Sequence, residues 1–131
     1  MPELRLVLQE SGKAYPESWD RACMWDGHPF EGKPCGCPVS CDERRNIFRM
    51  HGMFCSWNCA LAYGSVHLPN TTRSFVGMWI TKIVRALVRE SVRASGKKID
   101  TSKMQIPPAH HWCLLDRFTP NGLSIQDFRS P

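Results

Sequence analysis

Two cysteines four residues apart, Cys55 and Cys59, are the residues whose spacing most clearly indicates chemistry. They lie in the stretch FCSWNC at positions 54–59. If a helix begins at Ser56, both thiols face the same side of its first turn, where one metal ion can bind both. Structural zinc sites need four ligands in tetrahedral geometry and favour thiolate sulfur. The motif therefore predicts half of a Zn²⁺ site.

The other half must come from the cysteine-rich segment at 22–41. Cys23 and Asp26, in the stretch CMWD, have the two-residue gap of a zinc knuckle. An aspartate can bind zinc, although thiolate and imidazole are commoner in structural sites. We therefore expect Cys23, Asp26, Cys55 and Cys59 to bind the metal. The fourth position stays open to four other residues of this segment, namely His28, Cys35, Cys37 and Cys41.

The remaining cysteines also have a simpler interpretation. Free cysteine is often a small buried apolar residue, and this is the alternative for Cys35, Cys37 and Cys41. A second metal on these three cysteines together with His51 is another hypothesis. Cys113 stands alone among leucine and tryptophan residues at helical spacing, so we expect it in the core.

Length and composition narrow the class of protein. The chain has 131 residues, the size of one domain, and seven cysteines, an odd number. Its N-terminus lacks a signal-peptide pattern, and no apolar run approaches the ~18 residues that a membrane span needs. We therefore expect a single domain over 1–131, inside the cell, without membrane contact. Reduced, clustered cysteines in that compartment are more often ligands than disulfides.

The pattern of the chain predicts a small α+β zinc-binding domain with a treble-clef-like finger at 22–67, made of a loop, a β-hairpin and a short helix. A strand is expected at 4–8, a ligand-bearing loop at 22–41 because of its glycines and prolines, and a hairpin strand within 46–54. Helices are expected at 56–67, at 72–95 and at 107–115, and a last one after Ser124, which has an acidic residue three positions on. Residues 97–131 then form a linker and a helical tail.

The long helix carries most of the positive charge. The chain has a net charge of +5, and the excess of basic residues lies after residue 70. On a helical wheel, apolar residues gather on one side and Lys82, Arg85, Arg89 and Arg93 on the other. The first turns, around Phe75 and Met78, are apolar nearly all round, so we expect that end to be enclosed. The basic amphipathic helix at 71–96 predicts nucleic-acid contacts by Lys82, Arg85, Arg89, Arg93, Lys97 and Lys98. The alternative is an ordinary solvated face.

Several motifs in the same order resemble the late transcription factor two family of large DNA viruses, of the poxvirus type. That family shares its Phe-Cys-Ser motif with MYM-type zinc fingers. The resemblance covers roughly 23–64 and 107–129. Its residues are CMWD at 23–26, HPFEG at 28–32, Pro34, Pro38-Val39, GMFCSWNCALAY at 52–63, Pro107-Pro108, Leu114-Leu115, Phe118, Gly122, Ser124-Ile125 and Phe128-Arg129. Two departures stand out: Asp26 replaces the usual second knuckle cysteine, and Cys35, Cys37 and Cys41 replace apolar or aromatic residues.

The resemblance implies a viral factor for late-gene transcription with a structural zinc site. Its partners would be the viral RNA polymerase or other viral proteins, with DNA as a further partner. It would act in the host cell, in viral factories or the nucleus, or be packaged in the virion. The alternative is a zinc-stapled interaction protein or virion component that binds no nucleic acid directly. An enzyme is not expected, because the His110-His111-Cys113 cluster is supported by proximity alone.

Overall fold

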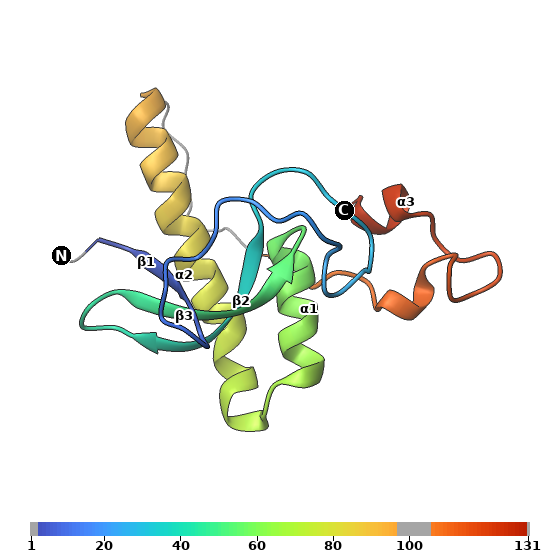
Figure 1. Ribbon diagram of the computed structural model, residues 1–131, viewed down its shortest axis with the longest axis horizontal. Coiled ribbons are helices and arrows are strands. Elements are labelled where there is room, and N and C mark those ends of the chain that lie inside the picture. Colours follow the sequence, from blue (N-terminus) through green and yellow to red (C-terminus); the bar gives the residue numbers. More distant parts are fainter. Residues whose placement is uncertain (1–2, 97–105, 131) are drawn as a thin grey trace.

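A computed structural model describes residues 3–96 and 106–130 of the chain (Figure 1). Three strands and two long helices come first, and a short segment of irregular structure follows. The elements are β1 (Arg5–Leu8), β2 (Cys35–Asp42), β3 (Ile47–Phe54), α1 (Trp57–His67), α2 (Asn70–Ser95), the 3₁₀ turn η1 (Trp112–Leu114) and α3 (Ile125–Arg129). The structure is thus a small α+β fold.

The strands form one sheet in the order β1-β3-β2. β1 pairs in parallel with β3, and β2 pairs antiparallel with it. The expectation of a loop throughout 22–41 is therefore wrong for its last part, which is strand β2. The edge position of β2 explains this, because proline is tolerated at edges and bulges. The pairing is irregular between Cys35 and Cys37 and between Pro38 and Ser40.

Both long helices begin and end where the sequence predicts, within two residues. Ser56 caps α1, and its hydroxyl accepts a hydrogen bond from the backbone N–H of Cys59. A serine at this position satisfies one of the free N–H groups of the first turn. α2 ends at Gly96, which has a left-handed backbone with φ of 74°. Glycine adopts this conformation without a steric cost.

α1 and α2 pack on β2 and on each other. Gly64 of α1 permits the close approach, since a Cβ there would lie 3.0 Å from both Cys37 Sγ and Val76 Cγ1. The core has two clusters. One lies between α1, α2 and the cysteine-rich segment and includes Phe54 and Ile80. The other is formed mainly by residues of β3 and α2 and includes Phe48 and Ile83.

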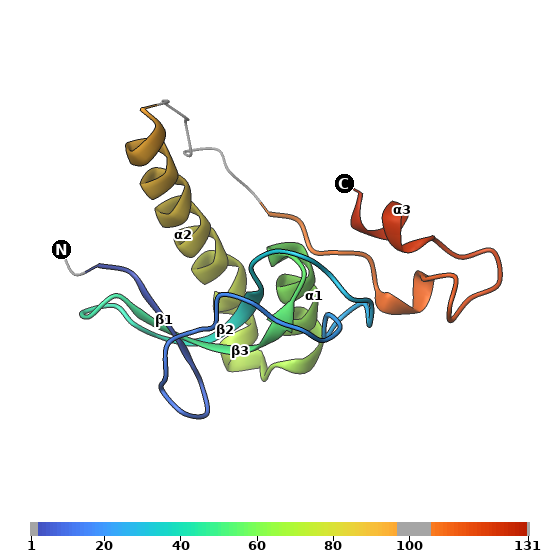
Figure 2. The same ribbon diagram turned by 45° about the horizontal axis from the view of Figure 1, so that its top comes forward.

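The start of α2 is not enclosed, contrary to expectation. The side chains of Phe75 and Met78 are 47% and 50% exposed, whereas Val76, Ile80 and Ile83 are fully buried. The apolar residues of these turns are therefore more numerous than the positions that the sheet and α1 cover. At the other end, the last turns of α2 project beyond the sheet (Figure 2).

The C-terminal segment lies on the side of α1 away from α2 (Figures 1 and 2). The helix expected at 107–115 is wrong, because only η1 is helical there. Backbone groups at its start bond to α1 instead: Asn58 Nδ2 donates to the Pro107 carbonyl at 2.7 Å, and Ala109 N donates to the Asn58 carbonyl at 3.0 Å. Cys113 is only partly buried and lies outside both core clusters.

The last helix follows its predicted cap, with the Ser124 hydroxyl accepting from Asp127 N. No helix within the described residues is long and apolar enough to cross a membrane.

The contrast along α2 gives a first prediction. Ile80→Ala should lower the free energy of unfolding by about 2–5 kcal/mol, because it leaves a cavity in the buried core. Phe75→Ala, on the exposed side of the same helix, should cost less than about 1 kcal/mol. Urea denaturation at a fixed metal concentration measures both. Equal losses would show that the start of α2 is covered after all.

Candidate metal centre

Cys23, Asp26, Cys55 and Cys59 form a cluster in which one ligand atom from each residue lies within 4.8 Å of all the others. This is close enough to hold a metal ion. Cys23, Asp26 and Cys59 are buried, and Cys55 is partly buried. Within the described residues, no other group of three or more histidine, cysteine or acidic side chains is this compact. Within the described part of the chain, Cys35, Cys37, Cys41 and His51 do not come together in such a group, so the structure gives no support to a second metal on them.

A tight turn supplies the first pair of ligands. Gly27 N donates to the Cys23 carbonyl at 2.9 Å, and Cys23 N donates to the His28 carbonyl at 2.9 Å. Gly27 has φ of 73°, a backbone conformation that residues with a side chain rarely adopt. The turn is fastened to β3, because Met24 N donates to the Met53 carbonyl at 2.9 Å. Cys23 and Asp26 thereby face the end of β3.

The junction of β3 and α1 supplies the second pair. Cys55 follows the last residue of β3, and Cys59 lies in the first turn of α1. Their sulfur atoms are 3.6 Å apart. The Ser56 cap fixes this turn, since its hydroxyl lies 3.2 Å from Cys59 N. The two thiols therefore converge as their spacing predicts.

Asp26 is the one buried acidic side chain among the described residues, and it is 1% exposed. Its Oδ2 atom faces the thiols, 3.3 Å from Cys55 Sγ and 3.8 Å from Cys59 Sγ. Its Oδ1 atom accepts a hydrogen bond from His28 N at 2.9 Å. Arg129 contacts both carboxylate oxygens, with Nε 3.0 Å from Oδ2 and Nη2 3.2 Å from Oδ1. One oxygen is thus directed at the cluster.

The three thiols of the cluster differ in their protonation. Hydrogen bonds from Cys55 and Cys59 lower the pKa of Cys23 to about 2. The hydrogen bond to Cys23 is also the main cause that raises the pKa of Cys55 to about 12, and it raises the pKa of Cys59 as well. One thiolate is therefore favoured, and two thiols stay protonated beside it. A bound cation would displace these protons, since the thiolate is the form that ligates metals.

The alternative fourth ligands lie outside the cluster. His28 contributes only backbone atoms next to it. Cys35, Cys37 and Cys41 lie on β2. Burial raises the pKa of Cys35 and of Cys37 to about 12, so both are neutral thiols. Cys37 is fully buried in the core, as the simpler interpretation of these cysteines predicts.

Sequence reasoning missed Arg129 as a residue of the site. It lies 103 positions from Asp26, and only the fold brings the two together. Arg129 also donates to the His28 and Pro29 carbonyls, at 3.1 and 3.2 Å. The available signal was chemical: a buried carboxylate needs a positive partner. No spacing rule pointed to this particular arginine.

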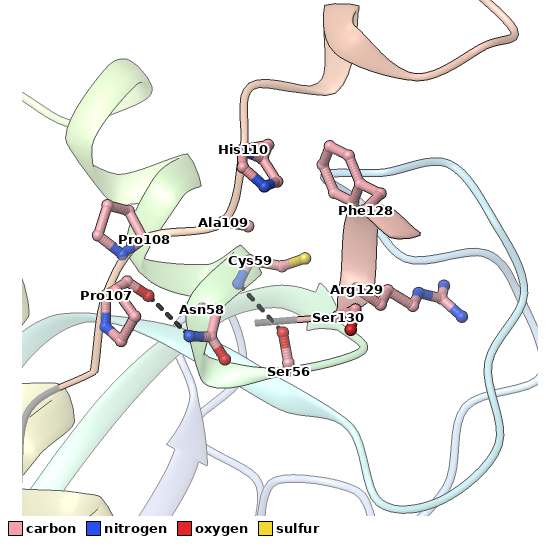
Figure 3. A pocket seen from close by; sticks show the side chains of 10 residues that line it. All are labelled: Ser56, Asn58, Cys59, Pro107, Pro108, Ala109, His110, Phe128, Arg129 and Ser130. Atoms are coloured by element: carbon pink, nitrogen blue, oxygen red, sulfur yellow. Dashed lines mark hydrogen bonds between the residues drawn. The ribbon is translucent and has the colours of Figure 1, made fainter. Parts of the chain in front are cut away.

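A cavity of about 300 Å³ adjoins the cluster between the start of α1 and the C-terminal segment. Figure 3 shows Cys59 at one wall and Phe128 and Arg129 at the other, with the hydrogen bond from Asn58 to Pro107 beside them. His110 also lines it. The C-terminal segment thus forms part of the wall beside Cys59.

The candidate nucleic-acid residues of α2 differ in their surroundings. Lys82 is exposed but lies 3.8 Å from Glu43, and Arg85 is partly buried. Arg89 and Arg93 are exposed on the projecting turns. Lys97 and Lys98 lie outside the described residues. The basic face is therefore narrower than the helical wheel suggests.

No protein-family model matches the chain. Neither the curated proteins nor the solved structures contain a significant match. The resemblance to the viral late transcription factors therefore stays a prediction from the motifs.

The site gives a second prediction. Cys59→Ser should abolish stoichiometric metal binding and lower the free energy of unfolding by more than about 3 kcal/mol, since structural zinc contributes about 10 kcal/mol or more. Cys113→Ser, a matched change outside the cluster, should leave both unchanged. Metal content and denaturation curves of the two variants measure this. The reverse ranking would place the metal elsewhere.

Proposed function

We propose that Cys23, Asp26, Cys55 and Cys59 bind one Zn²⁺ ion that stabilises the fold. The convergence of the four side chains is the observation that carries this proposal. Three thiolates and one carboxylate suit zinc, which accepts sulfur and oxygen ligands in a tetrahedral site. Four protein ligands leave no open position for a substrate, so the role we assign is structural rather than catalytic.

The order of the elements supports a treble-clef-like arrangement. The knuckle, the β2–β3 hairpin and α1 follow one another, and ligands come from the knuckle and from the junction of hairpin and helix. Because each element buries little apolar surface by itself, a metal bound to all of them would add substantially to their stability.

Metal removal gives a third prediction. The purified protein should contain about one zinc ion per chain, and chelation should unfold the segment around the knuckle and α1, because the fold then loses the binding free energy of the metal. Metal analysis and circular dichroism before and after chelation measure this. A metal-free protein with an intact fold would contradict the proposal.

For the biological role, we propose late-gene transcription in a large DNA virus, in concert with the viral RNA polymerase. The support comes from how the two matching parts of the chain, 23–64 and 107–129, lie in the fold. They are separate in sequence but contact each other around the cluster: Trp25 Nε1 donates to the His110 carbonyl at 2.8 Å, and Arg117 Nη1 donates to the Gly27 carbonyl at 3.2 Å. The two segments that carry the resemblance thus form one structural unit.

DNA contact is the part of this proposal that depends on α2. Arg89 and Arg93 would meet phosphates on the projecting turns, together with Lys97 and Lys98, which follow in the sequence and lie outside the described residues. Such contacts hold the backbone of nucleic acid without reading its sequence, and they weaken steeply as salt rises. The protein would work in viral factories or the nucleus of the host cell, or be packaged in the virion.

A second candidate function is protein binding, with the zinc serving only the fold. The specific observation is a shallow hollow of about 330 Å³ beside the knuckle, whose lining includes Met24, Trp112 and Phe118. Met24 is 47% and Phe118 51% exposed. Exposed apolar residues that gather in one place are typical of protein contacts. This candidate needs no basic helix.

A fourth prediction separates the two candidates. If DNA contact is direct, Arg89→Ala combined with Arg93→Ala should weaken DNA binding and flatten its salt dependence, because about two phosphate contacts are lost. Phe118→Ala should leave DNA binding unchanged. DNA titrations at several salt concentrations measure this for all variants.

The native complex supplies the complementary test. Polymerase subunits recovered with the wild-type protein from infected cells would support the transcription role. Recovery of capsid proteins alone, or loss of the partners in Phe118→Ala with no DNA binding by the wild type, would favour the second candidate.

A further inference from the structure

We propose that metal binding and docking of the C-terminal segment are thermodynamically linked through the Arg129–Asp26 pair. The segment is defined here as the C-terminal strap, residues 106–130. This inference rests on the proposed metal site and concerns how that site is controlled. Each event should strengthen the other by the same factor, because linkage between two binding equilibria is reciprocal.

The geometry of the carboxylate is the first support. Asp26 Oδ1 is occupied by His28 N at 2.9 Å and by Arg129 Nη2 at 3.2 Å, which leaves Oδ2 toward the thiols. Arg129 also donates from Nε to Oδ2 at 3.0 Å, so it grips both oxygens and, together with His28 N, holds the carboxylate in the orientation that turns Oδ2 toward the thiols. Groups that hold a ligand in this way raise metal affinity, and their loss typically costs about 10–100-fold.

Charge is the second support. A zinc ion with three thiolates and a carboxylate carries a net charge of about −2, since the four ligands contribute −4 and the metal +2. The guanidinium of Arg129 reduces this to about −1 in a buried site. Partial burial opposes the charge of Arg129, but its hydrogen bonds to Asp26 keep its pKa above the ordinary value. The strap thus brings a permanent positive charge to the cluster.

The anchoring of the strap is the third support. Arg129 holds the knuckle at three points, namely the Asp26 carboxylate and the carbonyls of His28 and Pro29. A knuckle that is ordered by the metal presents these acceptors together. Phe128, next to Arg129, is buried in the core cluster that contains Cys23 and Cys59. Docking of the strap and closure of the metal site therefore involve the same surface.

The test compares two arginines of the strap in the full-length chain. Arg129→Gln should lower zinc affinity about 10–100-fold, as measured by competition with a chromophoric chelator. Arg117→Gln is the matched control, because Arg117 also joins the strap to the knuckle through the Gly27 carbonyl but does not touch Asp26. It should change zinc affinity less than about 3-fold, because the hydrogen bond that it loses is exposed to solvent.

A double-mutant cycle isolates the carboxylate from the two carbonyl contacts. In an Asp26→Cys background a thiolate keeps the charge but cannot make the two-oxygen contact with Arg129. Arg129→Gln should therefore change zinc affinity less there than in the wild type, and the difference measures the contact apart from the charge. The Co²⁺-substituted proteins provide a check besides affinity, because the visible spectrum distinguishes three sulfur ligands from four. An equal effect of Arg129→Gln in both backgrounds would overturn the proposal.

Proteolysis measures the reciprocal effect. Zinc should slow tryptic cleavage after Arg117 in the wild type by the same factor that Arg129 adds to affinity, and it should protect Arg129→Gln much less at saturating zinc. Cleavage after Lys13, in the loop that follows β1, is the internal reference. If the wild type binds zinc but its strap is equally sensitive with and without the metal, the linkage is wrong and the zinc site stands. If the wild type binds no zinc, the site itself is wrong.

Discussion

The buried carboxylate of Asp26 is the constraint on which the rest of the metal centre depends. It lies among three cysteines in a position where water cannot solvate it, so its charge must be balanced by the protein. Arg129 supplies that balance from the far end of the chain. Since Arg129 must reach the knuckle, the C-terminal strap has to lie across α1, and its backbone groups bond to Asn58 and Trp25 instead of forming a helix. The identity of one knuckle residue thereby constrains the path of the last 25 described residues.

The features of the metal centre and of the helices that depend on local sequence could be predicted. The spacing of Cys55 and Cys59, the two-residue gap between Cys23 and Asp26, the Ser56 cap and the Gly96 stop each depend on neighbours within a few positions, and local stereochemistry decides them. The choice of Asp26 over the nearby cysteines needed the fold, because ligand chemistry alone favours sulfur. Cys37 has the better ligand atom, yet β2 directs it into the core against Gly64.

The predictions that were wrong concern features that depend on long-range contacts. β2 contains glycine and proline, which disfavour a strand locally, but pairing with β3 and an edge position compensate for both. The segment after Pro107 has helical periodicity, but α1 and the knuckle offer its backbone other partners. At the start of α2, the helical wheel shows which residues are apolar, but it does not show how many of them the sheet can cover. In each case the deciding neighbour is remote in sequence, and periodicity carries no information about it.

Trp57 shows how the metal centre is connected to the rest of the fold. It is the first residue of α1 and lies between the two cysteine ligands in sequence, and it packs against both core clusters. One cluster contains Cys23 and Cys59, whereas the other contains Phe48, Met50 and Ile83 and no metal ligand. The ion would therefore hold one half of the core directly and the other through Trp57 and the long helix. Ile80 belongs to the first cluster and Ile83, about one helical turn later, to the second, so α2 contacts both halves of the core.

The projecting basic turns of α2 lie beyond both clusters, so their charges can change without disturbing the site. Any role of these turns in binding polyanions is therefore physically separable from the role of the metal.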